Sequence, residues 1–137
     1  MSDLGEWHDV DDETDEGAGE DTPPRLYFGS VDEFVREMIV PVFRREVNPR
    51  ADLRWSARWW ESAEAVITLE ALWRAWEHLR LDPALGMSVW LRDHLHPHLA
   101  VLMSPTGPFG TSSGAAGAAE PLPYEPPPAG LFPDVRD

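Results

Sequence analysis

The spacing of apolar side chains predicts a first helix near residues 31–43. Between residues 34 and 43 these side chains recur every three to four positions, which is the period of one face of an α-helix. Ser30 and Glu33 stand in front of this face with the spacing of a capping box. Pro41 interrupts the pattern; it lacks an N–H and crowds the carbonyl of residue 37, so we expect a kink or a break there. The apolar face comprises Phe34, Val35, Met38, Ile39, Val42 and Phe43.

The strongest helical pattern lies at residues 63–79. Ser62 is the predicted N-cap, and Glu64 in the first turn complements the positive end of the helix dipole. We expect the acids of this region to lie on a solvated face. The apolar stripe comprises Val66, Leu69, Leu72, Trp73, Trp76 and Leu79, and the acids are Glu61, Glu64, Glu70 and Glu77.

A third helix is predicted after the turn "DPALG" at 82–86. Asp82 caps this turn and Gly86 closes it. Ser88 is the predicted cap of a short helix at 89–95, with Trp90 facing inward. Pro97 either ends this helix or opens another short one that runs to Met103.

Composition divides the chain of 137 residues into three parts. Residues 1–24 carry ten acids and no basic residue, and residues 111–137 are rich in Gly, Ala and Pro, so both are predicted to be disordered tails. The "PLPYEPPP" at 121–128 favours polyproline II, which suits either a docking peptide or a solvated tail. Of the net charge of −14, the parts 1–24, 25–110 and 111–137 carry −10, −1 and −3. The predicted fold is therefore an all-α domain at 25–110, a small orthogonal bundle of three to five short helices, between two disordered tails.

Several classes of protein do not fit this sequence. It has no cysteine, which excludes disulfides and thiolate metal sites. The acidic N-terminal stretch lacks the basic and apolar regions of a signal peptide, and no apolar run is long enough to span a bilayer. No phosphate-binding loop, dinucleotide fingerprint or G-x-S-x-G motif occurs. We expect a cytoplasmic protein that does not insert into membranes, has no cofactor and is not an enzyme.

The stretch "RWSARWW" at 54–60 carries the main functional hypothesis. Trp73, Trp76 and Trp90 are interpreted as core residues. Trp59 and Trp60 are adjacent and point in different directions, so we expect one to be buried and the other partly exposed. An exposed tryptophan beside an arginine is a favoured anchor of protein interfaces. The predicted partner-binding residues are Arg54, Arg58, Trp59 and Trp60, with Arg92 and His94 as neighbours.

Nucleic-acid binding is the alternative function. Five arginines and only two acids lie between residues 44 and 58, and guanidinium groups with indole rings suit phosphates and bases. Against this, the domain is close to neutral, whereas nucleic-acid-binding domains are usually basic. The arginines are Arg44, Arg45, Arg50, Arg54 and Arg58.

A metal site is the third hypothesis. His94, His96 and His98 alternate in "DHLHPHL", and on a strand all three would face one side, as in a three-imidazole zinc site. On a helix they would scatter around the axis. Because this part of the chain has helical character, we interpret them as surface or capping residues and assign no metal ligand.

Residues 54–109 resemble a known but uncharacterised family. The stretch reads "RWSARWWESAEAVITLEALWRAWEHLRLDPALGMSVWLRDHLHPHLAVLMSPTGPF". It is similar to small Trp-rich actinobacterial proteins with the ordered elements RWW, LEALWRAWE, DP, GMS, RDH and GPF. That family has no assigned catalytic residues, so the resemblance adds no site. It departs at His96, where the family usually has Asp before the proline.

The resemblance implies a genetic setting. Proteins of this family are often encoded on plasmids and integrative elements, near genes for conjugative type IV secretion. Together with the Arg/Trp stretch, this predicts a non-catalytic protein–protein interaction module, an accessory of a conjugative DNA-transfer or other mobile-element system.

Overall fold

Three helical stretches form the body of the molecule. The computed structural model describes residues 24–136. The first stretch comprises α2 (Val31–Phe34), a π-helical turn η1 (Val35–Ile39) and α3 (Val40–Val42). The second is a 3-10 turn η2 (Trp59–Glu61) followed by α4 (Ala63–Leu79), and the third comprises α5 (Gly86–Val89), a π-helical turn η3 (Trp90–Leu95) and α6 (His96–Leu102). The prediction of an all-α bundle of three to five helices is confirmed.

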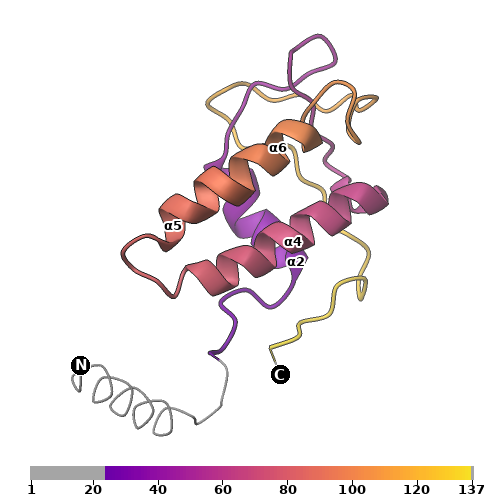
Figure 1. Cartoon of the computed structure of the whole chain (residues 1–137). Helices are drawn as coiled ribbons and strands as arrows, with labels where there is room; N and C mark the ends of the chain where they lie inside the picture. The colour runs from indigo at the N-terminus through magenta and orange to yellow at the C-terminus, as the bar shows by residue number, and fades with distance from the viewer. Residues whose placement is uncertain (1–23, 137) are drawn as a thin grey trace, which may run out of the picture.

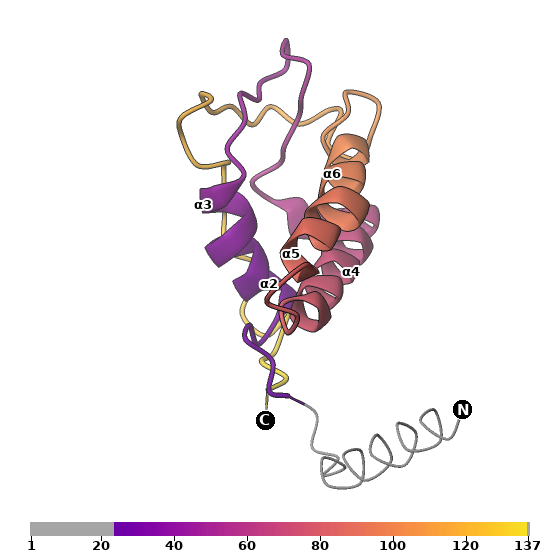
Figure 2. The same ribbon diagram turned by 60° about the vertical axis from the view of Figure 1, so that its left-hand side comes forward.

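The second and third stretches form an antiparallel pair. α4 and the continuous α5–α6 helix run side by side, and α2–α3 packs across them (Figure 1; Figure 2). Gly86 permits the tight turn between them, because a Cβ there would lie 1.8 Å from the main-chain oxygen of Leu79. Asp82 shapes the same turn, since its Oδ1 accepts hydrogen bonds from the amides of Ala84 and Leu85. Among the helices of residues 24–136, none has the length and apolarity needed to cross a membrane.

Both predicted serine caps are present. The hydroxyl of Ser30 accepts from the amide of Glu33 at 3.1 Å, and the Glu33 carboxylate accepts from the amide of Gly29. The hydroxyl of Ser62 accepts from the amide of Ala65 at 3.1 Å. Each cap pairs an amide that the first turn leaves free, and this fixes where α2 and α4 begin.

Pro41 lies in a helical stretch that ends one residue later, at Val42, and Pro97 lies in the first turn of α6, which runs to Leu102, in line with the second of the two predicted outcomes for Pro97. A π-helical turn precedes each of them: the amide of Val40 bonds the oxygen of Val35, and the amide of His96 bonds the oxygen of Leu91. In this wider register the bonds reach back five residues instead of four, so the carbonyl that a proline ring would crowd is displaced. The third helix consequently begins at Gly86, not at residue 89, and runs through Pro97 to Leu102.

The core lies between the three helical stretches. Trp73, Trp76 and Trp90 are buried, as predicted. The ring of Phe34 on α2 contacts both Trp76 and Trp90, with centroids 6.5 and 6.3 Å apart, and so joins the first helix to the other two. Large buried rings of this kind supply much of the hydrophobic stabilisation of a small domain.

Glu77 is buried, which corrects its predicted place on a solvated face. Its side chain is 5% exposed and accepts four hydrogen bonds. The donors are the amides of Tyr27 and Phe28, the indole N–H of Trp73 and Nε of Arg80. The carboxylate therefore ties the chain before α2 to the C-terminal end of α4.

The C-terminal segment packs on the helices, whereas the sequence predicted a disordered tail at 111–137. Val47 and Ala116 pair as an isolated antiparallel bridge. We call residues 121–136 the strap. Extended proline-rich chain pairs few of its own backbone groups, and some amides of the strap pair with the body instead. The amide of Leu122 bonds the oxygen of Val40, and the amide of Glu125 bonds the oxygen of Ala57.

The folded unit therefore extends to residue 136 and not to 110. In Figure 1 the strap, in yellow, passes along the body opposite the α5–α6 helix. The acidic tail predicted at 1–24 lies outside the described residues up to position 23.

Candidate functional site

The tryptophans of residues 54–60 hold the strap. Trp55 is fully buried, and its Nε1 donates to the main-chain oxygen of Pro123 at 2.9 Å. Nε1 of Trp60 donates to the main-chain oxygen of Glu125 at 3.0 Å. Trp59 stacks on Phe132 of the strap, with ring centroids 5.5 Å apart and planes inclined by 15°. We call Trp55, Arg58, Trp59 and Trp60 the tryptophan face.

Trp59 and Trp60 differ in exposure, as their adjacency predicted. Trp59 is fully buried, and its indole N–H has no acceptor among residues 24–136. Trp60 is half-buried. The prediction left open which of the two is the accessible ring, and the structure assigns that place to Trp60. Trp59 is thereby removed from the residues that a partner could contact while the strap is in place.

Arg58 lies beside Trp60 at the edge of the strap. Its guanidinium carbon is 5.7 Å from the centroid of the Trp60 ring, and its side chain is 53% exposed. Nε contacts the Glu125 carboxylate at 3.0 Å, and Nη1 contacts the Glu61 carboxylate at 3.2 Å. The hydrogen bond and the negative charge of Glu125 raise the pKa of Arg58 above its ordinary value.

The other predicted contact residues are not gathered at this face. Arg54 is half-buried and donates to the oxygen of Ala51, while its Nε has no acceptor in the described part of the chain. Arg92 is 71% exposed and pairs with its neighbour Asp93. Neither Arg92 nor His94 makes a hydrogen bond, an ion pair or a ring contact with residues 54–60 in the described structure. The structure therefore joins Arg58 to Trp60 and leaves Arg92 and His94 apart from them.

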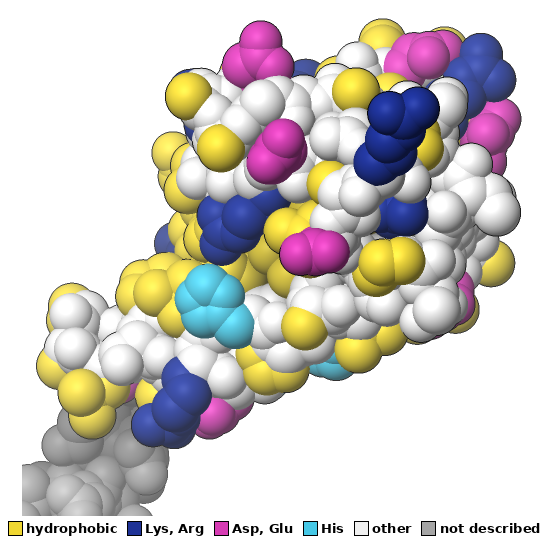
Figure 3. All heavy atoms as spheres, turned by 90° about the horizontal axis from the view of Figure 1, so that it is seen from above, with side chains coloured by type: hydrophobic (Ala, Val, Ile, Leu, Met, Phe, Trp, Pro, Cys, Tyr) yellow, Lys and Arg dark blue, Asp and Glu magenta, His cyan; other side chains and the backbone are white. Residues whose placement is uncertain are grey.

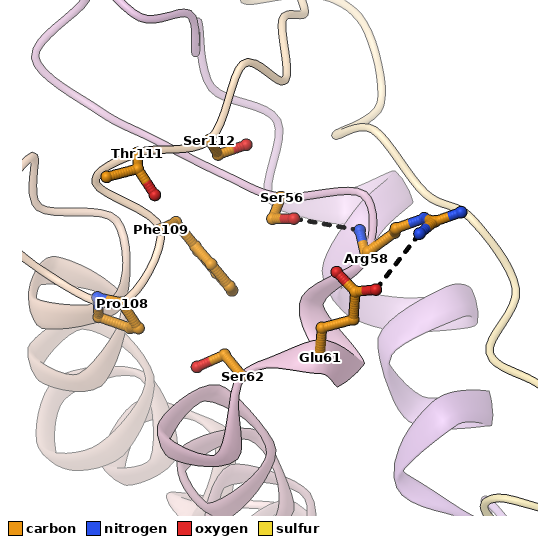
Figure 4. A pocket seen from close by; sticks show the side chains of 8 residues that line it. All are labelled: Ser56, Arg58, Glu61, Ser62, Pro108, Phe109, Thr111 and Ser112. Carbon is orange, nitrogen blue, oxygen red and sulfur yellow. Dashed lines mark hydrogen bonds and ion pairs between the residues drawn. The ribbon is translucent and has the colours of Figure 1, made fainter.

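A shallow hollow lies next to the tryptophan face. Its volume is about 210 Å³, below the several hundred Å³ that is usual for small-molecule sites. Figure 4 shows Arg58 and Glu61 on one side of it and Pro108 and Phe109 on the other. Its remaining lining residues are Ser56, Ser62, Thr111 and Ser112.

Three serine hydroxyls of this hollow bond the chain around it. Ser62 caps α4 through the amide of Ala65. The hydroxyl of Ser112 donates to the oxygen of Trp55 at 2.8 Å, and the hydroxyl of Ser56 accepts from the amide of Arg58. These bonds hold residues 54–62 in the geometry that presents the tryptophan face.

Tyr124 anchors the strap on the first helix. Its hydroxyl donates to Oδ1 of Asp32 at 2.5 Å. Burial, followed by the hydrogen bond and charge of Asp32, raises the pKa of Tyr124 to about 12. Sequence reasoning missed the strap residues of this site, and its only signal was the polyproline II pattern at 121–128.

Three arginines of the 44–58 stretch keep their charge uncompensated. Arg44 donates to the main-chain oxygens of Pro41 and Ala119, and Arg45 donates to that of Arg44. Within residues 24–136, neither of these side chains nor that of Arg50 forms an ion pair with a carboxylate. On the face seen in Figure 3, however, basic and acidic side chains are interspersed and do not form one continuous basic surface.

The three histidines lie along one helix. His94 belongs to η3, and His96 and His98 belong to α6. Because residues two apart on a helix point in very different directions, His96 points away from both His94 and His98, and the three imidazoles do not converge. No group of three His, Asp or Glu side chains that could hold a metal ion occurs in the described region.

Comparison with protein families identifies the family of the chain. A family model described as a domain of unknown function (DUF4913) matches residues 28–128. The chain belongs to this family. Comparison with curated proteins and with solved structures gives no match. The DUF4913 match contains the tryptophan face and the strap as far as Pro128, and it agrees with the resemblance to an uncharacterised domain family. The actinobacterial origin and the mobile-element setting stay predictions.

Proposed function

We propose that this DUF4913 domain is a non-catalytic protein-interaction module that acts through the tryptophan face. One observation carries the proposal: two indole N–H groups, those of Trp55 and Trp60, donate to main-chain oxygens of an extended proline-rich segment. Domains that bind such segments in other proteins use aromatic-lined grooves, because a polyproline II backbone is preformed and leaves its oxygens free.

The edge of the face offers further contacts. Arg58 and Trp60 lie together there, and both remain partly accessible beside the strap. Tryptophan and arginine are the residues most enriched among those that dominate binding energies. Three serine hydroxyls of the adjacent hollow are engaged in bonds that shape the chain, which supports a binding role for this region over a catalytic one.

A partner-recovery experiment with surface variants tests the proposal. The variants Trp60→Ala and Arg58→Glu change the face at its accessible edge. Arg92→Glu is a matched control, because Arg92 is also an exposed arginine paired with an acid but has no contact with the face. We expect both face variants to lose a partner that wild type and the control recover from the source organism. Equal recovery by all four proteins would contradict the proposal.

The proposed partner is a protein of a conjugative DNA-transfer or other mobile-element system. This part of the proposal is supported by the sequence resemblance alone. Identification of the recovered partner by mass spectrometry tests it separately from the role of the tryptophan face, and a partner with no role in DNA transfer would overturn this part only.

Nucleic-acid binding is the second candidate function. It is supported by Arg44, Arg45 and Arg50, whose guanidinium groups are not neutralised by carboxylates in residues 24–136. The test is a binding titration of labelled DNA at several salt concentrations, in which lost phosphate contacts reduce the salt dependence. Replacement of the three arginines by Glu should abolish binding while Arg92→Glu retains it. Binding should become stronger when residues 1–24 are deleted.

A further inference from the structure

We propose that the tryptophan face recognises a proline-rich segment of a partner protein with the pattern Leu-Pro-x-Glu, and that the strap is a built-in competitor for this site. This inference rests on the proposed function and names the partner chemistry of the same face. Its basis is the set of contacts between the face and residues 122–125.

The strap is bound in the way that a peptide ligand is bound. Leu122 is its one buried side chain, at 2% exposure, and the other residues of the strap are half-buried or exposed. The strap has no helix or strand of its own. The tryptophans beneath it belong to the core, since Trp55 and Trp59 have no exposed surface. A single apolar anchor with flanking backbone bonds is typical of peptide recognition by grooves.

The contacts define which residue types fit. At the first position, the Leu122 side chain is buried and its amide bonds the oxygen of Val40 at 3.1 Å. At the second position, Pro123 has no amide to leave unpaired, and its oxygen accepts from Nε1 of Trp55. A proline here also favours the extended conformation that presents this oxygen.

The fourth position requires both an amide and an acid. The amide of Glu125 donates to the oxygen of Ala57 at 3.0 Å, so a proline cannot replace this residue without loss of a hydrogen bond. Its oxygen accepts from Nε1 of Trp60, and its carboxylate contacts Nε of Arg58. Three separate interactions thus converge on this one residue, whereas the side chain of the third residue, Tyr124, points to Asp32 on the first helix.

The strap competes because it belongs to the same chain. It follows a Gly-, Ala- and Ser-rich stretch at 110–119, and a tethered segment acts at an effective concentration on the order of millimolar. A free peptide therefore gains access in proportion to the fraction of molecules whose strap is displaced. Contacts outside the recognition pattern, Tyr124 with Asp32 and Phe132 with Trp59, hold the strap in place.

The experiment uses the full chain and a fluorescent peptide of residues 119–130, AEPLPYEPPPAG. Fluorescence anisotropy measures its affinity for wild type, for Phe132→Ala and for Tyr124→Phe. Both variants weaken the strap without altering the contacts of residues 122, 123 and 125. We expect at least one folded variant to bind the peptide about tenfold more tightly than wild type, because more molecules have a displaced strap.

Matched peptides test the recognition pattern. A peptide with proline in place of Glu125 lacks both the amide and the carboxylate, and it should not bind. A peptide with glutamine at that position keeps the amide and should bind less tightly than the unchanged peptide. Thermal unfolding identifies which strap variants are folded. If Phe132→Ala does not fold, the peptide affinities are measured with Tyr124→Phe.

Three outcomes overturn the inference: no peptide binding by folded strap variants, equal affinity for wild type and variants, or equal binding of the peptide with proline at position 125. If any of these occurs while partner recovery still depends on Trp60 and Arg58, the face binds its partner through other chemistry and the proposed function stands. If partner recovery is also unchanged by Trp60→Ala, both conclusions fail.

Discussion

Trp60 donates its indole N–H to the main-chain oxygen of Glu125, 65 residues further along the chain. The carboxylate of the same glutamate contacts Arg58, whose guanidinium lies near the ring of Trp60. Glu125 of the C-terminal strap therefore bonds two adjacent members of the tryptophan face, Arg58 and Trp60, at once. This closes a long segment of extended chain onto the body, and it makes residues 121–136 part of the folded unit.

The indole N–H groups of Trp55 and Trp59 should contribute differently to stability. Both side chains are fully buried, but within residues 24–136 only the indole N–H of Trp55 has an acceptor, the oxygen of Pro123. Trp55→Phe and Trp59→Phe remove similar volumes, so the difference between them reports the hydrogen bond. We expect Trp55→Phe to lower the free energy of unfolding by about 1 kcal/mol more than Trp59→Phe, measured by urea denaturation. An equal or larger loss for Trp59→Phe would contradict the bond assignment.

Glu77 should be far more sensitive to substitution than another acid of the same helix. In Glu77→Gln an amide NH₂ replaces one oxygen and faces groups that are themselves donors, so buried bonds are lost. We expect this change to lower the free energy of unfolding by about 2–3 kcal/mol. Glu70 is exposed on α4, and Glu70→Gln should change it by less than about 0.5 kcal/mol. Similar melting temperatures for the two variants would mean that the Glu77 carboxylate does not hold the chain before α2 against the C-terminal end of α4.

Tyr124 should make stability depend on pH at the alkaline end. Burial and the Asp32 carboxylate raise the pKa of Tyr124 from 10.0 to about 12 in the folded protein. Because the folded-state pKa exceeds the unfolded value, the contribution of the neutral phenol is complete below pH 10 and is lost as the pH rises toward 12. Tyr124→Phe should abolish this part of the pH dependence. The check is the unfolding free energy of both proteins across this range, and parallel curves would refute the assignment.

Gly86 should not tolerate a side chain. A Cβ at this position would approach the oxygen of Leu79 to 1.8 Å, and that atom is backbone that cannot move without opening the turn between α4 and α5. We expect Gly86→Ala to destabilise the protein by at least about 2 kcal/mol. Gly117→Ala is the control, since its Cβ meets only the flexible side chain of Glu120 at 3.3 Å. Comparable melting temperatures for both variants would show that the turn adapts.

The helices were predictable because their signals are local. The apolar period of residues 63–79 and the caps at Ser30 and Ser62 depend on neighbours within one or two turns, and both caps form as expected. For Pro97 the sequence left two outcomes open, and the structure shows the second, a short helix that runs on to Leu102. A π-helical turn precedes both Pro41 and Pro97, and the sequence did not predict either turn. A sequence pattern does not show whether a π-helical turn will accommodate a proline within a helix or whether the proline will end that helix.

The site was less predictable because its contacts are distant in sequence. That one of Trp59 and Trp60 is buried follows from their adjacency, but which one depends on Phe132, which stacks on Trp59. Glu77 resembles any acid of a solvated helix until the amides of Tyr27 and Phe28 meet it from 50 and 49 residues away. The composition of residues 111–137 indicates disorder because it is rich in Gly, Ala and Pro. The strap is instead ordered by contacts with the body: hydrogen bonds, the buried side chain of Leu122 and the stacking of Phe132 on Trp59.

Nuclear magnetic resonance relaxation of the backbone amides of Leu122 and Glu125 tests the central claim most directly, namely that the tryptophan face holds the strap. Both amides donate to oxygens of the body, those of Val40 and Ala57. We predict order parameters of about 0.85, equal to those of α4 and typical of rigid backbone. Values below about 0.6 at both positions, with α4 rigid in the same sample, would contradict the account.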